Sequence, residues 1–150
     1  MIFFNMAPDQ IKHLEFIQAV ITRMNDNSFQ LKGWSIAIIS ALLALYANSN
    51  NVIYIFVAII PTLLFWGLDA YYLQQERKFR GVYNSVSGQK NDVEIKPFEM
   101  PIHKFQGGQY CFFKVLFSKT IAWLYGTICT LLLFGGLILK FKDCITINSN

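Results

Sequence analysis

The fold of this chain is decided by one uncharged stretch, GWSIAIISALLALYANSNNVIYIFVAIIPTLLFWGL, residues 33–68. A helix that crosses the hydrocarbon core of a bilayer needs about 20 apolar residues, and about 17 at the least. The stretch is too long for one such helix, and the polar turn at residues 48–51 divides it in two. We therefore predict a helical hairpin with spans over roughly 33–48 and 52–69. A second uncharged run, residues 120–139, predicts a third span.

The composition favours a membrane protein over a soluble one. Hydrophobic residues make up 54% of the 150 residues and charged residues only 15%, whereas soluble domains carry about 25% charged residues. A soluble chain of this length has no second layer thick enough to cover three such helices. The predicted fold class is an all-α membrane protein, with a cytoplasmic amphipathic helix at 1–32, a transmembrane hairpin at 33–69, a cytoplasmic segment at 70–119, a third transmembrane helix at 120–139 and an outer tail at 140–150.

The basic residues predict the orientation of the spans. Eleven of the 13 Lys and Arg residues precede the first span or lie between the second and the third, and the other two are Lys140 and Lys142. Because basic residues collect on the cytoplasmic side, we expect the N-terminus and residues 70–119 inside and the tail outside. The net charge of +4 then indicates topology and attraction to anionic lipid. Nucleic acid is not an expected partner, since the cations are dispersed and no nucleic-acid motif is present.

The N-terminal region is predicted to be an amphipathic helix over residues 9–27. Its apolar side chains share one face at 100° per residue: Ile11, Leu14, Ile17, Val20, Ile21 and Met24. Two alternatives stay open. The helix could lie along the cytoplasmic leaflet, or its apolar face could pack on the transmembrane helices or on a neighbouring subunit.

A polar segment, RMNDNSFQLKGW, residues 23–34, joins this helix to the first span. We expect the helix to bend here, because the short polar side chains of Asn25, Asn27 and Ser28 can bond backbone groups at caps and turns. Lys32 and Trp34 are expected at the depth of the lipid headgroups.

Small side chains mark helix contacts on two of the spans. On the first span they form a stripe within about 120° of arc, consisting of Ala37, Ser40, Ala41, Ala44 and Ala47. The third span has a weaker version around Gly126, with Ala122 and Thr130. Small residues let helix backbones approach closely in lipid. The pattern leaves open whether the partner helix belongs to the same chain or to another subunit.

The second span carries a polar face and a proline. Pro61 lies near the middle of the span and predicts a kink, because it has no N–H to donate. Thr62, Asp69 and Glu76 recur on one face at helical spacing. Asp69 stands at the depth of Lys32, and an ionisable group there needs a partner or water. Two roles stay open: a structural pair of Asp69 with Lys32 or Arg23, or the lining of a cytoplasmic pore vestibule.

Enzyme chemistry is not indicated. No HExxH motif, nucleophile elbow or glycine-rich phosphate loop is present, and the carboxylates are few and dispersed. His13 is interpreted as an interfacial polar residue rather than a ligand. We therefore expect no catalytic residue, no cofactor and no metal site.

Two runs resemble a family of small bacterial membrane proteins. FIQAVITRMNDNSFQLKGW contains the pattern RM-x-x-NSF-x-x-KGW, and FWGLDAYYLQQERKFRGVY contains FW-x-LD-x-YYL-x-x-ER. The resemblance covers residues 14–86 and is poor elsewhere. Members of the family often sit beside anti-phage signalling genes such as those of TIR-domain proteins, and they are similar to SLATT-type membrane effectors.

The resemblance implies an inner-membrane effector of anti-phage defence. Such a protein would permeabilise or depolarise the membrane once a cytoplasmic signalling protein or a nucleotide signal triggers it. Three short spans cannot enclose a conducting path, so this function requires a homo-oligomer in the lipid bilayer. The alternative is a non-conducting membrane anchor or accessory subunit that recruits a cytoplasmic defence enzyme.

Overall fold

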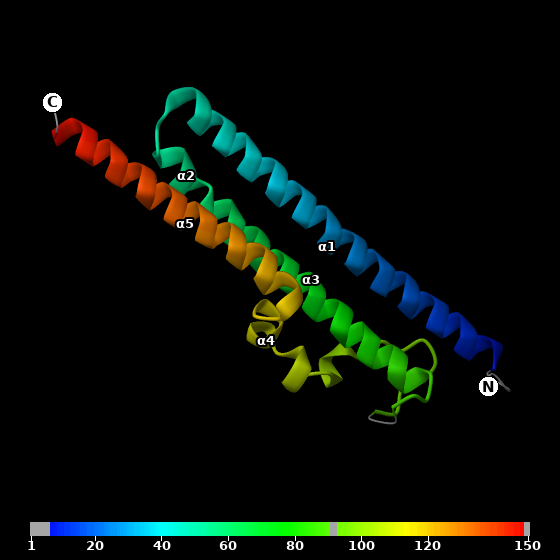
Figure 1. Ribbon diagram of the computed structural model, residues 1–150. Coiled ribbons are helices and arrows are strands. Elements are labelled where there is room, and N and C mark those ends of the chain that lie inside the picture. Colours follow the sequence, from blue (N-terminus) through cyan, green and yellow to red (C-terminus); the bar gives the residue numbers. More distant parts are fainter. Residues whose placement is uncertain (1–6, 91–92, 149–150) are drawn as a thin grey trace. The chain divides into compact units, whose positions relative to one another are not determined.

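The computed structural model describes residues 7–90 and 93–148, and every regular element within these ranges is helical (Figure 1). The elements are α1 (Pro8–Ser49), α2 (Ile53–Val57), α3 (Ile59–Val86), two short 3-10 helices η1 (Ile102–Lys104) and η2 (Gly108–Tyr110), α4 (Phe112–Leu116) and α5 (Lys119–Asn148). Three stretches are long and apolar enough to cross a membrane: Pro8–Ser49, Ile53–Val86 and Lys119–Lys142. The predicted fold class, an all-α membrane protein with three spans, is confirmed.

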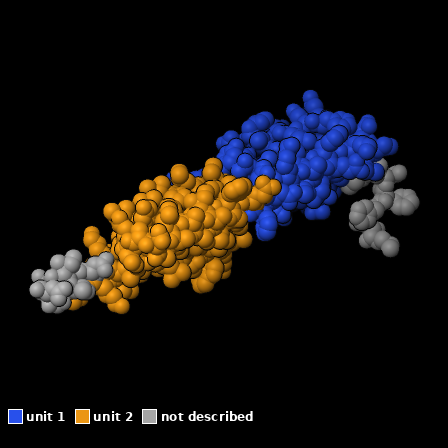
Figure 2. Space-filling model, turned by 90° about the horizontal axis from the view of Figure 1, so that it is seen from above, with its two compact units in different colours: residues 1–29, 70–115 blue, residues 30–69, 116–150 orange. Residues whose placement is uncertain are grey.

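The chain divides into two compact units (Figure 2). Unit 1 consists of Met1–Phe29 and Ala70–Val115, and unit 2 of Gln30–Asp69 and Leu116–Asn150. Each unit has an apolar core of its own. The core of unit 1 is formed by Ile17, Ile21, Val82 and Phe105, and that of unit 2 by Ile39, Ile55, Ala58 and Leu132.

The first helix corrects one prediction. α1 is uninterrupted from Pro8 to Ser49, so the expected bend over residues 25–28 is wrong. Asn and Ser cost a helix only some tenths of a kcal/mol, which tertiary contacts on either side outweigh. Before the polar segment, Ile17 and Ile21 pack in the core of unit 1. Ile17 and Ile21 therefore pack on the segment 70–119, which was predicted to be cytoplasmic and which neither alternative named.

The second span is divided at Ala58, where α2 has ended and α3 has not yet begun. Pro61 lies in the first turn of α3. It has no N–H to donate, and its ring crowds the carbonyl four residues earlier, which is that of Val57, the last residue of α2. The interruption of the helical ladder therefore precedes the proline by one turn.

The end of α3 lies beyond Gly81. Glycine commonly follows the last residue of a helix, but α3 continues past Gly81 to Val86. A Cβ atom at Gly81 would lie 2.6 Å from Cδ1 of Phe105 and 2.8 Å from the hydroxyl of Tyr110. This glycine thus permits the 93–110 segment of unit 1 to approach α3 and does not end the helix.

The helix of the third span begins within one residue of the predicted start at residue 120 and ends beyond the predicted end at residue 139. α5 begins at Lys119 and continues to Asn148, so the boundary at residue 139 marks the first charges and not the end of the helix. Residues 140–148 contain no glycine or proline that would stop it. The remainder of the predicted outer tail, residues 149–150, and the first part of the predicted N-terminal segment, residues 1–6, lie outside the described residues, as do residues 91–92.

Candidate functional site: a buried polar cluster in unit 2

A buried ion pair joins α1 to α3. The ammonium of Lys32 lies 2.7 Å from Oδ2 of Asp69 and donates to Oδ1 at 3.0 Å. The Asp69 side chain is fully buried, whereas 26% of the Lys32 side chain is exposed. Of the two cations that the sequence offered to Asp69, Lys32 therefore makes the contact. The other, Arg23, is exposed on α1.

Tyr125 of α5 is the third member of this cluster. It is the largest fully buried side chain in the described part of the chain, and its hydroxyl faces Asp69 without forming a hydrogen bond within the described residues. The phenol ring stacks on the indole of Trp66, with ring centroids 6.3 Å apart and an interplanar angle of 11°. Each of the three spans thus contributes one polar side chain to the cluster.

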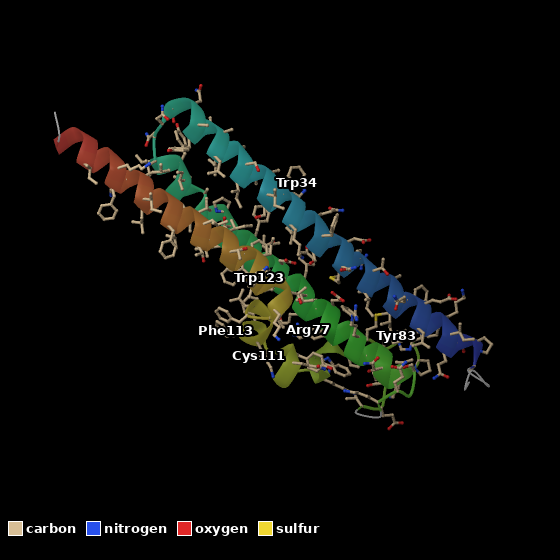
Figure 3. All side chains as sticks on the ribbon, in the orientation of Figure 1. Trp34, Arg77, Tyr83, Cys111, Phe113 and Trp123 are labelled. Carbon is tan, nitrogen blue, oxygen red and sulfur yellow. The ribbon has the colours of Figure 1, made fainter. Side chains whose placement is uncertain are left out.

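Trp66 fixes the chain that leads into α5. Its indole Nε1–H donates to the carbonyl oxygen of Leu116 over 2.9 Å. The ring of Phe117 meets the indole edge-on, with centroids 6.0 Å apart. Together with the stack on Tyr125, these contacts set the position of the first turns of α5 next to Asp69. Trp34 of α1 and Trp123 of α5 are exposed on the surface of unit 2 (Figure 3). The position of Trp34 at headgroup depth stays a prediction.

The other polar candidates on the second span are buried and locally bonded. Thr62 has no exposed surface, and its hydroxyl donates to the carbonyl oxygen of Ala58 over 2.7 Å. Thr62 therefore supplies a hydrogen-bond donor to a backbone carbonyl at the interruption between α2 and α3. Glu76 belongs to unit 1, where its carboxylate lies 2.7 Å from Nη2 of Arg80. Neither is part of the cluster around Asp69.

The small-residue stripe of α1 faces away from the rest of unit 2. All of its members are exposed: Ala37, Ser40, Ala41, Ala44 and Ala47. The opposite face of the helix carries the buried Ser35 and Ile39. The chain's own helices therefore pack on the face of α1 that carries Ser35 and Ile39 and leave the stripe uncovered.

Two glycines of α5, Gly126 and Gly136, differ in whether another helix lies close to them. A Cβ atom at Gly126 would meet nothing within 4 Å, and the residue lines an open groove of about 460 Å³ on the helix surface. Gly136 is the glycine at which α5 approaches α2, which runs alongside it (Figure 1). A Cβ there would lie 3.1 Å from Cζ of Phe56 and 3.3 Å from Cγ2 of Ile55.

The environment of Asp69 determines what the cluster can do. An ionised carboxylate is costly to bury unless it is paired and hydrogen-bonded, and lipid offers no water to replace a lost partner. Asp69 meets this requirement with the ammonium of Lys32 on α1, which donates to Oδ1 over 3.0 Å. The ion pair is therefore a polar link between α1 and α3.

Tyr125, Trp66 and Gly136 were missed by sequence reasoning. The run 120–139 offered a signal for the first, because a tyrosine in an otherwise uncharged span tends to place its hydroxyl near a polar group when it is buried. The choice between Gly126 and Gly136 depends on which face of α5 meets α2, and the spacing of small residues does not determine this.

No protein-family model, curated protein or solved structure significantly matches the chain. The resemblance to defence-associated membrane effectors therefore rests on the motif residues in the segment 14–86 alone.

Proposed function

We propose that this chain is the subunit of an oligomeric membrane effector that permeabilises the bacterial inner membrane in anti-phage defence. The three apolar helices support a place in the membrane. The motif resemblance supports the defence role and a trigger from the cytoplasm, either a signalling protein or a nucleotide signal. The basic residues before the first span and between the second and third support an inward N-terminus.

One observation carries the oligomeric part of the proposal, namely the exposure of the small-residue stripe on α1. In lipid there is no hydrophobic drive between helices, and close approach of backbones across small residues is what favours association. A small face that the chain itself does not cover is therefore suited to a second subunit. The open groove at Gly126 on α5 is a second surface of the same kind.

The core of unit 2 supports the need for several copies. Its interior is filled by apolar side chains of all three spans: Ile39, Ile55, Ala58 and Leu132. A water-filled path through one chain would have to replace this packing. Conduction is therefore assigned to the space between subunits. In that arrangement Asp69, whose side chain has no exposed surface, is a structural link and not a pore-lining residue.

The stripe provides the experiment. In Ala41→Leu and Ala44→Leu the larger side chain separates the backbones, so we expect each to lose most of the crosslinked oligomer and most of the dye leakage from expressing cells. Leu43→Ala is the matched control, because Leu43 is exposed on α1 outside the stripe, and it should change neither reading. The proposal fails if the two stripe variants assemble and leak as the parent does.

A second candidate, a non-conducting anchor that recruits a cytoplasmic enzyme, is favoured by a patch on unit 1. Phe16 and Phe98 are each more than half exposed, and their ring centroids lie 6.3 Å apart. Phe98 holds a positive φ of 65°, a conformation that bulky residues rarely adopt without a reason. An exposed aromatic pair suits a protein partner. If the parent chain binds a partner through Phe98 and never leaks, the anchor role replaces the effector role.

A further inference from the structure

One end of unit 2 carries a pocket of about 470 Å³ between the polar turn of the hairpin and α5. Its lining residues come from the turn, from α2 and from a single position of α5: Ser49, Asn50, Asn51, Val52, Ile53, Phe56 and Lys140. α2 and α5 lie side by side in this unit (Figure 1). The pocket thus joins two stretches that are far apart in the sequence.

The pocket lies where two uncharged runs end. The turn at residues 48–51 is the polar break in the run 33–68, and Lys140 is the first charged residue after the run 120–139. Lysine side chains near the ends of spans extend to the membrane interface. The two boundaries follow from separate parts of the sequence, and the pocket brings them together. We therefore place this pocket at the depth of the lipid headgroups.

The polar groups of the pocket are suited to an anion. Lys140 is exposed, and among the side chains that the structure describes it has no ion-pair partner. Oδ1 of Asn51 accepts from the backbone N–H of Ile53 over 3.0 Å, and the NH₂ end of this amide supplies donors. None of the described lining residues is acidic. An ammonium and an amide NH₂ are donors that a phosphate oxygen accepts from.

The apolar part of the pocket favours a lipid over a soluble anion. Val52, Ile53 and Phe56 line the pocket beside its polar groups. Ile53 is 63% exposed, and exposed apolar side chains continue along the span at Val57 and Ile60. A fatty acyl chain attached to the phosphate would cover this apolar surface, whereas a free phosphate ion would leave it uncovered.

We infer that this pocket binds the phosphate of an anionic phospholipid, with the ammonium of Lys140 as the counter-charge and the amide of Asn51 as a further donor. Choline and ethanolamine headgroups carry a positive charge of their own beside the phosphate, so a lipid without such a charge is preferred. One lysine near the membrane surface corresponds to a preference of about fivefold. The inference stands on the geometry of unit 2 and does not depend on the proposed function.

The experiment uses the full chain in nanodiscs of phosphatidylcholine that contain a minor fraction of phosphatidylglycerol. Mass spectrometry of the intact protein released from the nanodiscs counts the molecules of each lipid that remain bound. In the parent we expect phosphatidylglycerol to be enriched about fivefold over its share of the bilayer. Lys140→Gln should abolish the enrichment. Because Lys140 is exposed and Gln has a similar helix propensity, α5 should stay intact, which an unchanged helix content verifies.

Lys142→Gln is the matched control. It removes the same charge from the same end of α5, but Lys142 does not line the pocket, so the enrichment should persist. Equal loss of enrichment in both variants would show attraction by surface charge alone and would overturn the site. Full enrichment in Lys140→Gln would overturn it as well.

Excess inorganic phosphate distinguishes the lipid from a soluble anion. Enrichment that persists in its presence supports a lipid site, whereas displacement of phosphatidylglycerol by phosphate would overturn that assignment.

Dye leakage from the same nanodisc preparations, once transferred to vesicles, separates this inference from the proposed function. Enrichment in a chain that never leaks leaves the lipid site standing and refutes the effector role. Leakage from a chain without enrichment refutes the lipid site and leaves the effector role intact.

Discussion

Unit 1 and unit 2 each include parts of the long helices α1 and α3. The two units differ in the polar contacts that join their segments. In unit 1, side chains bond the backbone of irregular segments at several separate points. Nε2–H of His13 donates to the carbonyl oxygen of Glu99 over 3.0 Å, and Nε2–H of Gln74 donates to that of Tyr110 over 2.7 Å. In unit 2, α1 and α3 are joined by the ion pair of Lys32 with the buried Asp69.

The difference shows how the surroundings dictate the way a chain is held together. Around unit 1, most charges of the segment 70–115 remain on the surface, and an irregular backbone can be satisfied by side chains or by water. The spans of unit 2 are uncharged over residues 33–68 and 120–139, and a polar group there depends on protein partners. Loss of one partner should therefore cost more in unit 2 than in unit 1.

The largest effect is expected from Asp69→Asn in unit 2. The change leaves the Lys32 ammonium beside a neutral amide, and removing one member of a buried pair is strongly destabilising. Because part of Lys32 is exposed, water softens the penalty, and we expect the free energy of unfolding to fall by about 2–3 kcal/mol. Unfolding in mixed lipid–detergent micelles measures this. A loss below about 0.5 kcal/mol, the size typical of surface changes, would mean that the pair contributes little.

An intermediate effect is expected from Gly81→Ala in unit 1. The new methyl group would overlap the buried ring of Phe105, and overpacking of this kind costs about 1–3 kcal/mol, of which the better helix propensity of Ala returns up to about 1. We expect a net loss of about 1–2 kcal/mol, seen as earlier exchange of amide hydrogens in residues 93–110.

Gly67→Ala is the control for that prediction, because it lies on the same helix and a Cβ there meets nothing within 4 Å. It should stabilise the protein by about 0.5–1 kcal/mol. If Gly81→Ala and Gly67→Ala both raised the free energy of unfolding, helix propensity, and not the approach of Phe105, would decide the role of Gly81.

The smallest effect is expected from Gln74→Ala, which leaves the carbonyl oxygen of Tyr110 without this donor. A neutral hydrogen bond contributes about 1 kcal/mol, and water can replace the amide at a partly exposed site. The free energy of unfolding should therefore fall by at most about 1 kcal/mol, and Gln75→Ala serves as the adjacent comparison. A loss as large as that of Asp69→Asn would remove the proposed distinction between the two units.

The spans could be predicted from the sequence because they depend on length and charge. The uncharged run at 33–68 and the polar turn at 48–51 suffice for a hairpin, whatever packs against it. Helix ends were less predictable. Gly81 suggested an end of α3 and residues 25–28 a bend in α1, but both positions lie inside helices, because contacts with distant segments outweigh local preferences of this size.

The site could be predicted in part. Asp69 and Lys32 were matched by their depth along two neighbouring spans, which follows from the hairpin alone, and they lie 2.7 Å apart. Tyr125 could not be matched in this way. Its place depends on the rotation of α5 about its own axis, which is fixed by Gly136 and Trp66 and not by any pattern within 120–139.

The central claim is that the polar cluster of unit 2 links the spans, and a double-mutant cycle on Lys32 and Asp69 tests it most directly. The unfolding free energies of the parent, Lys32→Gln, Asp69→Asn and the double variant give the coupling between the two side chains. Because the pair is in direct contact, we expect a coupling of about 1–3 kcal/mol, with the double variant more stable than Asp69→Asn alone. A coupling within about 0.5 kcal/mol of zero, with additive losses, would contradict the account.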